Sequence, residues 1–200
     1  MKKAEIIKYL KSKYKAQKFD SAWEFILKDD DEGELAIIPN LSGTPKRQQL
    51  LALPSLNLPW HKQLDLQLFQ GKDGFVRPFF VGKQYRYYSE SGIVEEEHID
   101  MMIEYCFEWF KQQIQPEPVA LDMKKHYEQI TGFPPAGWQP KHILACVLKG
   151  DVEKLQSYLD AFKRGDRMEF IPMIQQEYFE RAIPLAEKYR SGELVSPVRF

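Results

Sequence analysis

The spacing of hydrophobic residues changes twice along this chain, and that change constrains the fold more than any other feature. Over residues 3–18 they recur at helical intervals, at Ile6, Ile7, Leu10 and Tyr14. Over about residues 22–38 and 64–88 apolar and polar residues mainly alternate, as they do in half-buried strands. From Glu95 the helical interval returns. A run of strands between helical segments predicts an α+β fold that begins with an N-terminal helix.

The alternating region predicts five strands joined by hairpins. The first two strands pair across a polar turn at residues 29–33, where Gly33 is expected to take a positive φ angle. The other strands are predicted at residues 64–69, 75–81 and 84–88, with tight turns at residues 71–74 and 82–83. Because hairpins join antiparallel strands, we expect a five-stranded antiparallel meander sheet.

Residues 40–62 interrupt this predicted sheet. They contain Pro45, Pro54 and Pro59. Proline has no backbone N–H, so these residues argue against a continuous helix or a central strand. We therefore expect a long irregular loop, and such loops inside compact domains are often functional.

The segment that starts at Glu95 predicts a long helix that is apolar around most of its circumference, since Met101 and Tyr105 widen its apolar stripe. Such a helix is buried on more than one side, so we expect it to pack on the sheet and on later helices. Further helices are predicted at about 120–131, 140–149, 151–164 and 168–191. Gly150 is expected to end one helix and Asp151 to cap the next.

These elements predict two parts that share one core. Residues 1–115 are expected to form an α-β5-α sheet unit, and residues 116–200 a helical extension packed on it as a cap. The proline-containing segment at residues 115–118 is the predicted linker.

Composition limits the classes of function. There are 28 basic and 29 acidic residues, a balance that argues against a dedicated nucleic-acid binder. The two cysteines, Cys106 and Cys146, lie in separate apolar runs, which does not suit a disulfide framework or a zinc ribbon. Charges interrupt every apolar run near the N-terminus, and no run approaches the roughly 20 residues that span a bilayer. We expect a cytoplasmic protein that does not bind membranes.

No catalytic or cofactor-binding motif occurs in the sequence, so we expect no cofactor, no bound metal and no catalytic residue. His142 and Cys146 share one helix face, as a nucleophilic pair or half of a metal site would, but no third ligand lies nearby. A buried structural cysteine is the better interpretation. His98 follows three glutamates, yet consecutive helical residues point in different directions and cannot share one ion.

Six residues are predicted to contact a partner. Asp29, Asp30 and Asp31 form the densest acidic run, at an expected hairpin tip, and binding residues are often presented on loops. Trp60, His61 and Trp138 lie in proline-rich segments, and exposed tryptophans are frequent at binding hot spots.

Three functional hypotheses follow. The first is a non-enzymatic protein that binds another macromolecule, expected to be a protein, with an immunity- or antitoxin-like or regulatory role in a bacterium as its most specific version. The alternative is a small hydrolase-like enzyme whose site is assembled from distant residues, namely His61, Asp65, Arg77, His142 and Cys146. A weak nucleic-acid binder is a further alternative, because Tyr85–Tyr88 could stack on bases and residues 2–18 are basic.

Overall fold

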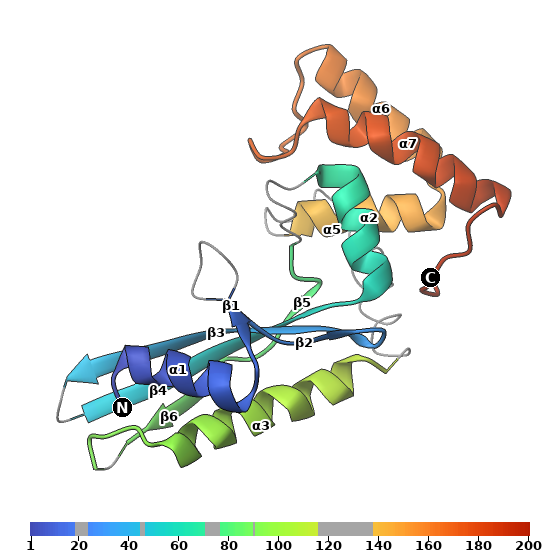
Figure 1. Ribbon diagram of the computed structural model, residues 1–200. Coiled ribbons are helices and arrows are strands. Elements are labelled where there is room, and N and C mark those ends of the chain that lie inside the picture. The colour runs from blue at the N-terminus through green and yellow to red at the C-terminus, as the bar shows by residue number, and fades with distance from the viewer. Residues whose placement is uncertain (19–23, 45–46, 71–76, 90, 116–137) are drawn as a thin grey trace. The chain divides into compact units, whose positions relative to one another are not determined.

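The chain folds into two compact units. The computed structural model describes residues 1–18, 24–44, 47–70, 77–89, 91–115 and 138–200. The first unit comprises Met1–Pro59 and Arg77–Ile114, and the second comprises Trp60–Val76 and Gln115–Phe200. Helices and one antiparallel sheet confirm the predicted α+β class (Figure 1).

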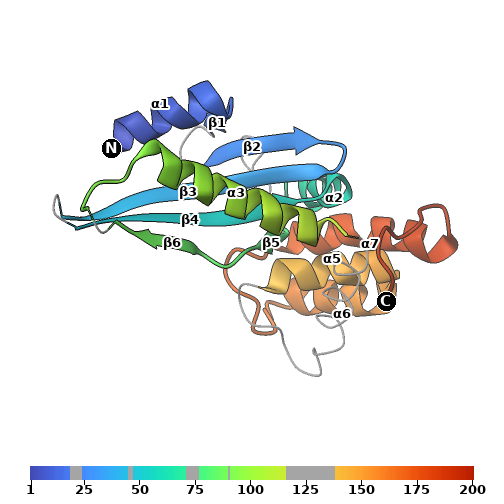
Figure 2. The ribbon, with the colours of Figure 1, turned by 90° about the horizontal axis from the view of Figure 1, so that it is seen from below.

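The first unit is a sheet with two helices. It contains α1 (Lys3–Lys13), β1 (Gln17–Lys18), β2 (Phe25–Asp30), β3 (Gly33–Thr44), β4 (Arg47–Asn57), β5 (Phe80–Val81), β6 (Tyr85–Tyr88) and α3 (Glu96–Gln113). Neighbouring strands pair antiparallel in the order β1-β2-β3-β4, and β5 and β6 both pair with β4 on its other side. Figure 2 shows α3 running across one face of this sheet.

The hairpin between β2 and β3 confirms the prediction for its turn. Gly33 has a φ angle of 146° and pairs with Asp30. A Cβ atom at this position would lie 2.9 Å from the carbonyl oxygen of Asn57. Glycine is therefore required both by the backbone conformation and by the close approach of β4.

The irregular loop predicted at residues 40–62 is wrong, since β3 extends to Thr44 and β4 spans Arg47–Asn57. The Pro54 carbonyl accepts a hydrogen bond from the N–H of Gly82, at 2.8 Å. The N–H and C=O of a strand residue point to the same side, so the missing N–H of Pro54 faces the break between β5 and β6. At that break the register shifts by one residue and a bulge forms, and a proline is tolerated there. The tight turn predicted at residues 82–83 is also wrong, because the chain runs past this bulge without reversing.

The strand predicted at residues 64–69 is a helix, α2 (Pro59–Phe69). Pro59 occupies its first position, where a proline needs no N–H partner. Its buried side carries Leu64, Leu68 and Phe69 together with two polar residues. Leucines at every second position fit a strand, but Leu64 and Leu68 are also one helical turn apart, so the pattern was ambiguous.

The side of α3 that faces the sheet carries the core of the first unit. Ile99, Met102, Ile103, Cys106 and Phe110 are all buried. Met101 is 52% exposed, so the prediction that it widens the buried stripe is wrong. The expected packing of residues 116–200 on the first unit stays a prediction.

The second unit contains α2, α5 (Gln139–Lys149), α6 (Val152–Lys163) and α7 (Gln176–Ser191). Gly150 ends α5 with a φ angle of 71°, and the Asp151 side chain accepts a hydrogen bond from the Lys154 N–H, so both predicted caps are confirmed. Helix α7 starts at Gln176, eight residues later than the predicted 168. The predicted helix at 120–131 and the strand residues 75–76 lie outside the described residues.

Contacts within the second unit fasten α2 to α7. The Arg181 side chain donates a hydrogen bond to the carbonyl of Leu68 at 2.7 Å, and the rings of Phe69 and Tyr178 meet edge to face at 4.9 Å. Among the helices in the described ranges, none has the length and apolar character needed to cross a bilayer.

Candidate functional site: the open face of the sheet

The two faces of the sheet differ in what covers them. Tyr85 and Tyr87 point toward α3, since the ring of Tyr85 lies 5.3 Å from that of Tyr105 and Tyr87 stacks on His98 at 4.3 Å. Successive side chains of a strand point to opposite faces, so Arg86 and Tyr88 lie on the other face. Two of the three tyrosines that suggested base stacking, Tyr85 and Tyr87, therefore pack against α3.

Strand register identifies the other residues on that side. Tyr88 pairs with Gln49, Arg86 pairs with Leu51, and Val81 pairs with Ser55. Leu53, between Leu51 and Ser55 in this alternation, pairs with Ile38 of β3. We call this surface the open face and define it by six residues: Ile38, Leu51, Leu53, Val81, Arg86 and Tyr88.

The open face exposes large apolar side chains. Ile38 is 42% exposed, and Val81 and Tyr88 are each 55% exposed. Leu51 and Leu53 lie between them and are half-buried. An apolar centre with a polar border is the usual composition of a protein-binding surface.

Carboxylates lie near one end of the open face. Burial raises the pKa of Glu24 above its ordinary value, and the neighbouring Glu34 carboxylate raises it further. The Asn57 side chain donates a hydrogen bond to Glu34 at 3.1 Å and accepts one from the Phe79 N–H at 3.0 Å. At the β6 end the charge is positive, where Arg86 is exposed and donates to the Gln84 side chain at 3.0 Å. The open face therefore has carboxylates near one end, a guanidinium group at the other and apolar side chains between them.

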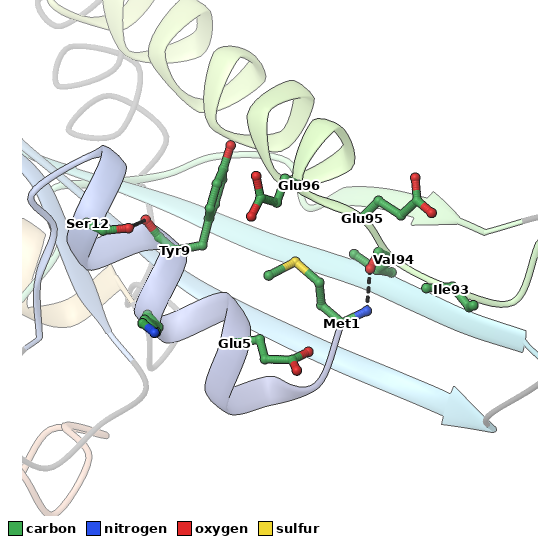
Figure 3. Close-up of a pocket in the computed structure, with 9 residues that line it drawn as sticks. Met1, Glu5, Tyr9, Ser12, Ile93, Val94, Glu95 and Glu96 are labelled. Carbon is green, nitrogen blue, oxygen red and sulfur yellow. Dashed lines mark hydrogen bonds between the residues drawn. The ribbon is translucent and has the colours of Figure 1, made fainter.

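A second candidate is an open groove of about 570 Å³ between α1 and the segment that enters α3 (Figure 3). Its lining includes three carboxylates, those of Glu5, Glu95 and Glu96. Glu5 accepts a hydrogen bond from the Lys2 N–H at 2.6 Å, and Glu95 and Glu96 begin α3. Acidic side chains stabilise the first turn of a helix, so these charges have a structural explanation.

Beside this groove, Asp100 fastens α1 to α3. It accepts hydrogen bonds from the hydroxyls of Tyr9 and Tyr14 and from the Lys13 ammonium, the last at 2.7 Å. Burial alone would raise the pKa of Asp100, but these three donors outweigh it and hold the pKa below its ordinary value. His98, in the first turn of α3, accepts from the Glu95 N–H at Nδ1 and contacts the Tyr87 hydroxyl at Nε2. Both ring nitrogens are thus engaged in structural hydrogen bonds.

The structure does bring His142 and Cys146 together, but inside the second unit. Their Nε2 and Sγ atoms are 3.6 Å apart, and the Tyr158 hydroxyl lies 2.9 Å from the same nitrogen. All three side chains are buried. Burial raises the pKa of the Cys146 thiol to about 12, which leaves little thiolate for nucleophilic attack at neutral pH. The arrangement suits a satisfied core better than a catalytic site.

Comparison with known proteins bears on the whole chain. The sequence profile of a family of unknown function matches residues 2–187, which include most of both units. The chain belongs to DUF6990. No curated protein and no solved structure matches this member of DUF6990.

The residues predicted to contact a partner take different positions. Asp29, Asp30 and Asp31 are exposed at the β2–β3 tip, where Lys28 forms an ion pair with Asp30 at 3.1 Å. Trp60 is half-buried on α2. Trp138 is 38% exposed, with the Lys141 ammonium 4.2 Å above its ring.

His61 belongs to the second unit and is 1% exposed. Asp65, one turn further along α2, is equally buried. Arg77 belongs to the first unit, whereas the other four residues of the predicted composite enzyme site belong to the second. In the parts of the chain that the structure describes, no group of three or more His, Cys, Asp or Glu could hold a metal ion.

Sequence reasoning missed the centre of the open face. Ile38, Leu51 and Leu53 lie in or beside the segment predicted to be a loop, because its prolines argued against strands. The available signal was the apolar run at Leu50–Leu53, which fits a strand as well as a loop.

Proposed function

We propose that this chain is a non-enzymatic protein-binding protein and that the open face is its contact surface. One observation carries the proposal. Ile38, Val81 and Tyr88, three large apolar side chains from three strands, are exposed on one face of the sheet. Sites built on strands keep their geometry, and exposed apolar side chains that lie together mark interaction surfaces.

Two features support binding over hydrolysis. The Cys146 thiol is buried with its pKa raised to about 12, and its histidine neighbour contacts a tyrosine that is also buried. The carboxylates that line the groove beside α1 lie at the N-terminal ends of α1 and α3, where they stabilise the first helical turns. A neutralising role toward a toxin, as in immunity proteins and antitoxins, is the most specific form of this proposal and would require a stoichiometric protein partner.

Site-specific photo-crosslinking in the native cell tests the proposal. A photoreactive amino acid is placed at Ile38, Leu53 or Tyr88, and at Met101 as the control. Met101 is a similarly exposed apolar residue on α3, which covers the other face. We expect one discrete protein adduct from the three open-face positions and none from Met101.

The captured partner then allows a quantitative check. Ile38→Asp should weaken binding by about tenfold or more, as loss of a central apolar contact does, whereas Met101→Asp should have little effect. Equal adducts at all four positions, adducts with nucleic acid, or no adduct would each contradict the proposed function.

A further inference from the structure

Strand β6 leaves one of its two edges without a partner strand among the described residues. It pairs with β4, and Figure 2 shows it along the outer border of the sheet. The Ser89 N–H donates to the Gln48 carbonyl at 3.0 Å, which makes that pair a hydrogen-bonded one. Hydrogen-bonded and non-hydrogen-bonded pairs alternate along an antiparallel ladder, so Tyr87 and Tyr85 also bond to β4. The N–H and C=O groups of Arg86 and Tyr88 therefore point outward.

The same two residues present their side chains on the open face. Tyr88 is 55% exposed, and Arg86 is exposed beside half-buried Leu51. An incoming strand at this edge would meet backbone donors and acceptors, an aromatic ring and a guanidinium group together. The bulge at residues 82–84 ends the ladder on one side, so the accessible edge is about as long as β6 itself.

We propose that the partner contributes an extended segment that adds to the sheet beside β6, with an acidic side chain near Arg86 and apolar side chains on the open face. This inference rests on the proposed function and names the kind of segment that the surface takes. Backbone hydrogen bonds hold the segment, while the side chains at alternate positions select it.

The charge of the β5–β6 edge favours a different protein over a second copy of this chain as the partner that adds a strand. The exposed charged residues of the β5–β6 edge, Lys83 and Arg86, are both basic. Pairing two β6 strands would bring like charges together across the new ladder, which is destabilising. An acidic extended segment is complementary to the same two residues, so a heterologous partner fits this edge and a β6–β6 dimer does not.

Amide hydrogen exchange on the full chain tests strand addition. The probes are two eight-residue peptides that alternate valine and threonine, one with a central aspartate and one with lysine in its place. We expect the aspartate peptide at millimolar concentration to slow exchange at the Arg86 and Tyr88 amides. The Tyr85 and Tyr87 amides, which already bond to β4, serve as internal controls and should not change.

Two variants separate the backbone contribution from the side-chain contribution. Tyr88→Pro removes an outward N–H without touching the β4 ladder and should weaken peptide binding by about fivefold, whereas Tyr88→Thr keeps the N–H. Arg86→Glu should invert the preference between the two peptides by about two- to fivefold in each direction. An inverted preference cannot arise from a misfolded protein.

The outcomes distinguish this inference from the proposed function. If crosslinks form at Ile38 and Leu53 but neither peptide slows exchange at Arg86 and Tyr88, strand addition is wrong and the open face still binds a protein. If neither peptide binds and no crosslink forms, both fail. Slowed exchange that Tyr88→Pro leaves unchanged would also overturn strand addition.

Discussion

The two faces of the sheet carry similar residues but differ in how far those residues are covered. On the face under α3, the rings of Tyr85 and Tyr87 pack against those of Tyr105 and His98. On the open face, Tyr88 of the same short strand is more than half exposed. The comparison teaches that residue type alone does not decide which side chains stay exposed in this fold. The face to which strand alternation assigns each side chain does.

The largest expected effect tests whether only the covered face contributes to the core. Phe110 of α3 is 1% exposed and lies 3.6 Å from where a Cβ at Gly33 would be. Phe110→Ala should lower the free energy of unfolding by about 3–5 kcal/mol, because it leaves a cavity. Tyr88→Ala is the matched aromatic control and should cost less than about 0.5 kcal/mol. Urea denaturation measures both, and equal losses would erase the distinction between the faces.

A smaller effect is expected at the bulge that joins β5 to β6. A Cβ at Gly82 would lie 2.7 Å from the Trp109 ring and 2.8 Å from the Pro54 ring. Gly82→Ala should therefore destabilise the protein by about 1–3 kcal/mol, the usual cost of overpacking. Lys83→Ala, at the exposed neighbouring residue, should leave the urea midpoint nearly unchanged. A tolerated Gly82→Ala would mean that α3 is not seated closely on β4.

The smallest effects concern charge, and they should differ in sign between the two faces. On α3, the pKa of Asp100 is lowered, so Asp100 stabilises the fold above its ordinary pKa of 3.8 and loses that contribution as pH falls through the lowered value. Asp100→Asn should cost about 1 kcal/mol or less at neutral pH and progressively less in acid. Near Ser55, the strand partner of Val81, burial raises the pKa of Glu24, so the contribution of Glu24 to stability is lost as pH rises through the raised value.

Glu24→Gln should therefore stabilise slightly at neutral pH and have no effect below the ordinary pKa of 4.5. Thermal unfolding of both variants between pH 3 and pH 8 checks the two signs, and a shared sign would contradict the electrostatic contrast between the faces.

The elements that local signals define were predicted well. Gly150 and Asp151 specify a helix end and a helix start through their own backbone and side chain, and the structure has both. Helix α3 begins at Glu96, one residue after the predicted start, since its hydrophobic spacing extends over five turns.

The elements that depend on distant contacts were not predicted. Pro54 is acceptable in β4 only because the bulge of a later strand lies opposite its missing N–H. Leu64 and Leu68 fit a strand and a helix equally, and the buried contacts of α2 within the second unit select the helix. The open face could not be assigned for the same reason, because its residues come together only once the register of β3, β4 and β6 is known.

The division of the chain between its units has a consequence for its synthesis. Helix α2 belongs to the helical unit, yet it is encoded between two strands of the sheet. A ribosome releases α2 long before α7, whose Arg181 and Tyr178 hold it. The contacts that these two residues make with α2 therefore form only after the last strands and α3 have been made. For the same reason no single cut yields two whole units, and a truncation at residue 115 would remove the α7 contacts of α2.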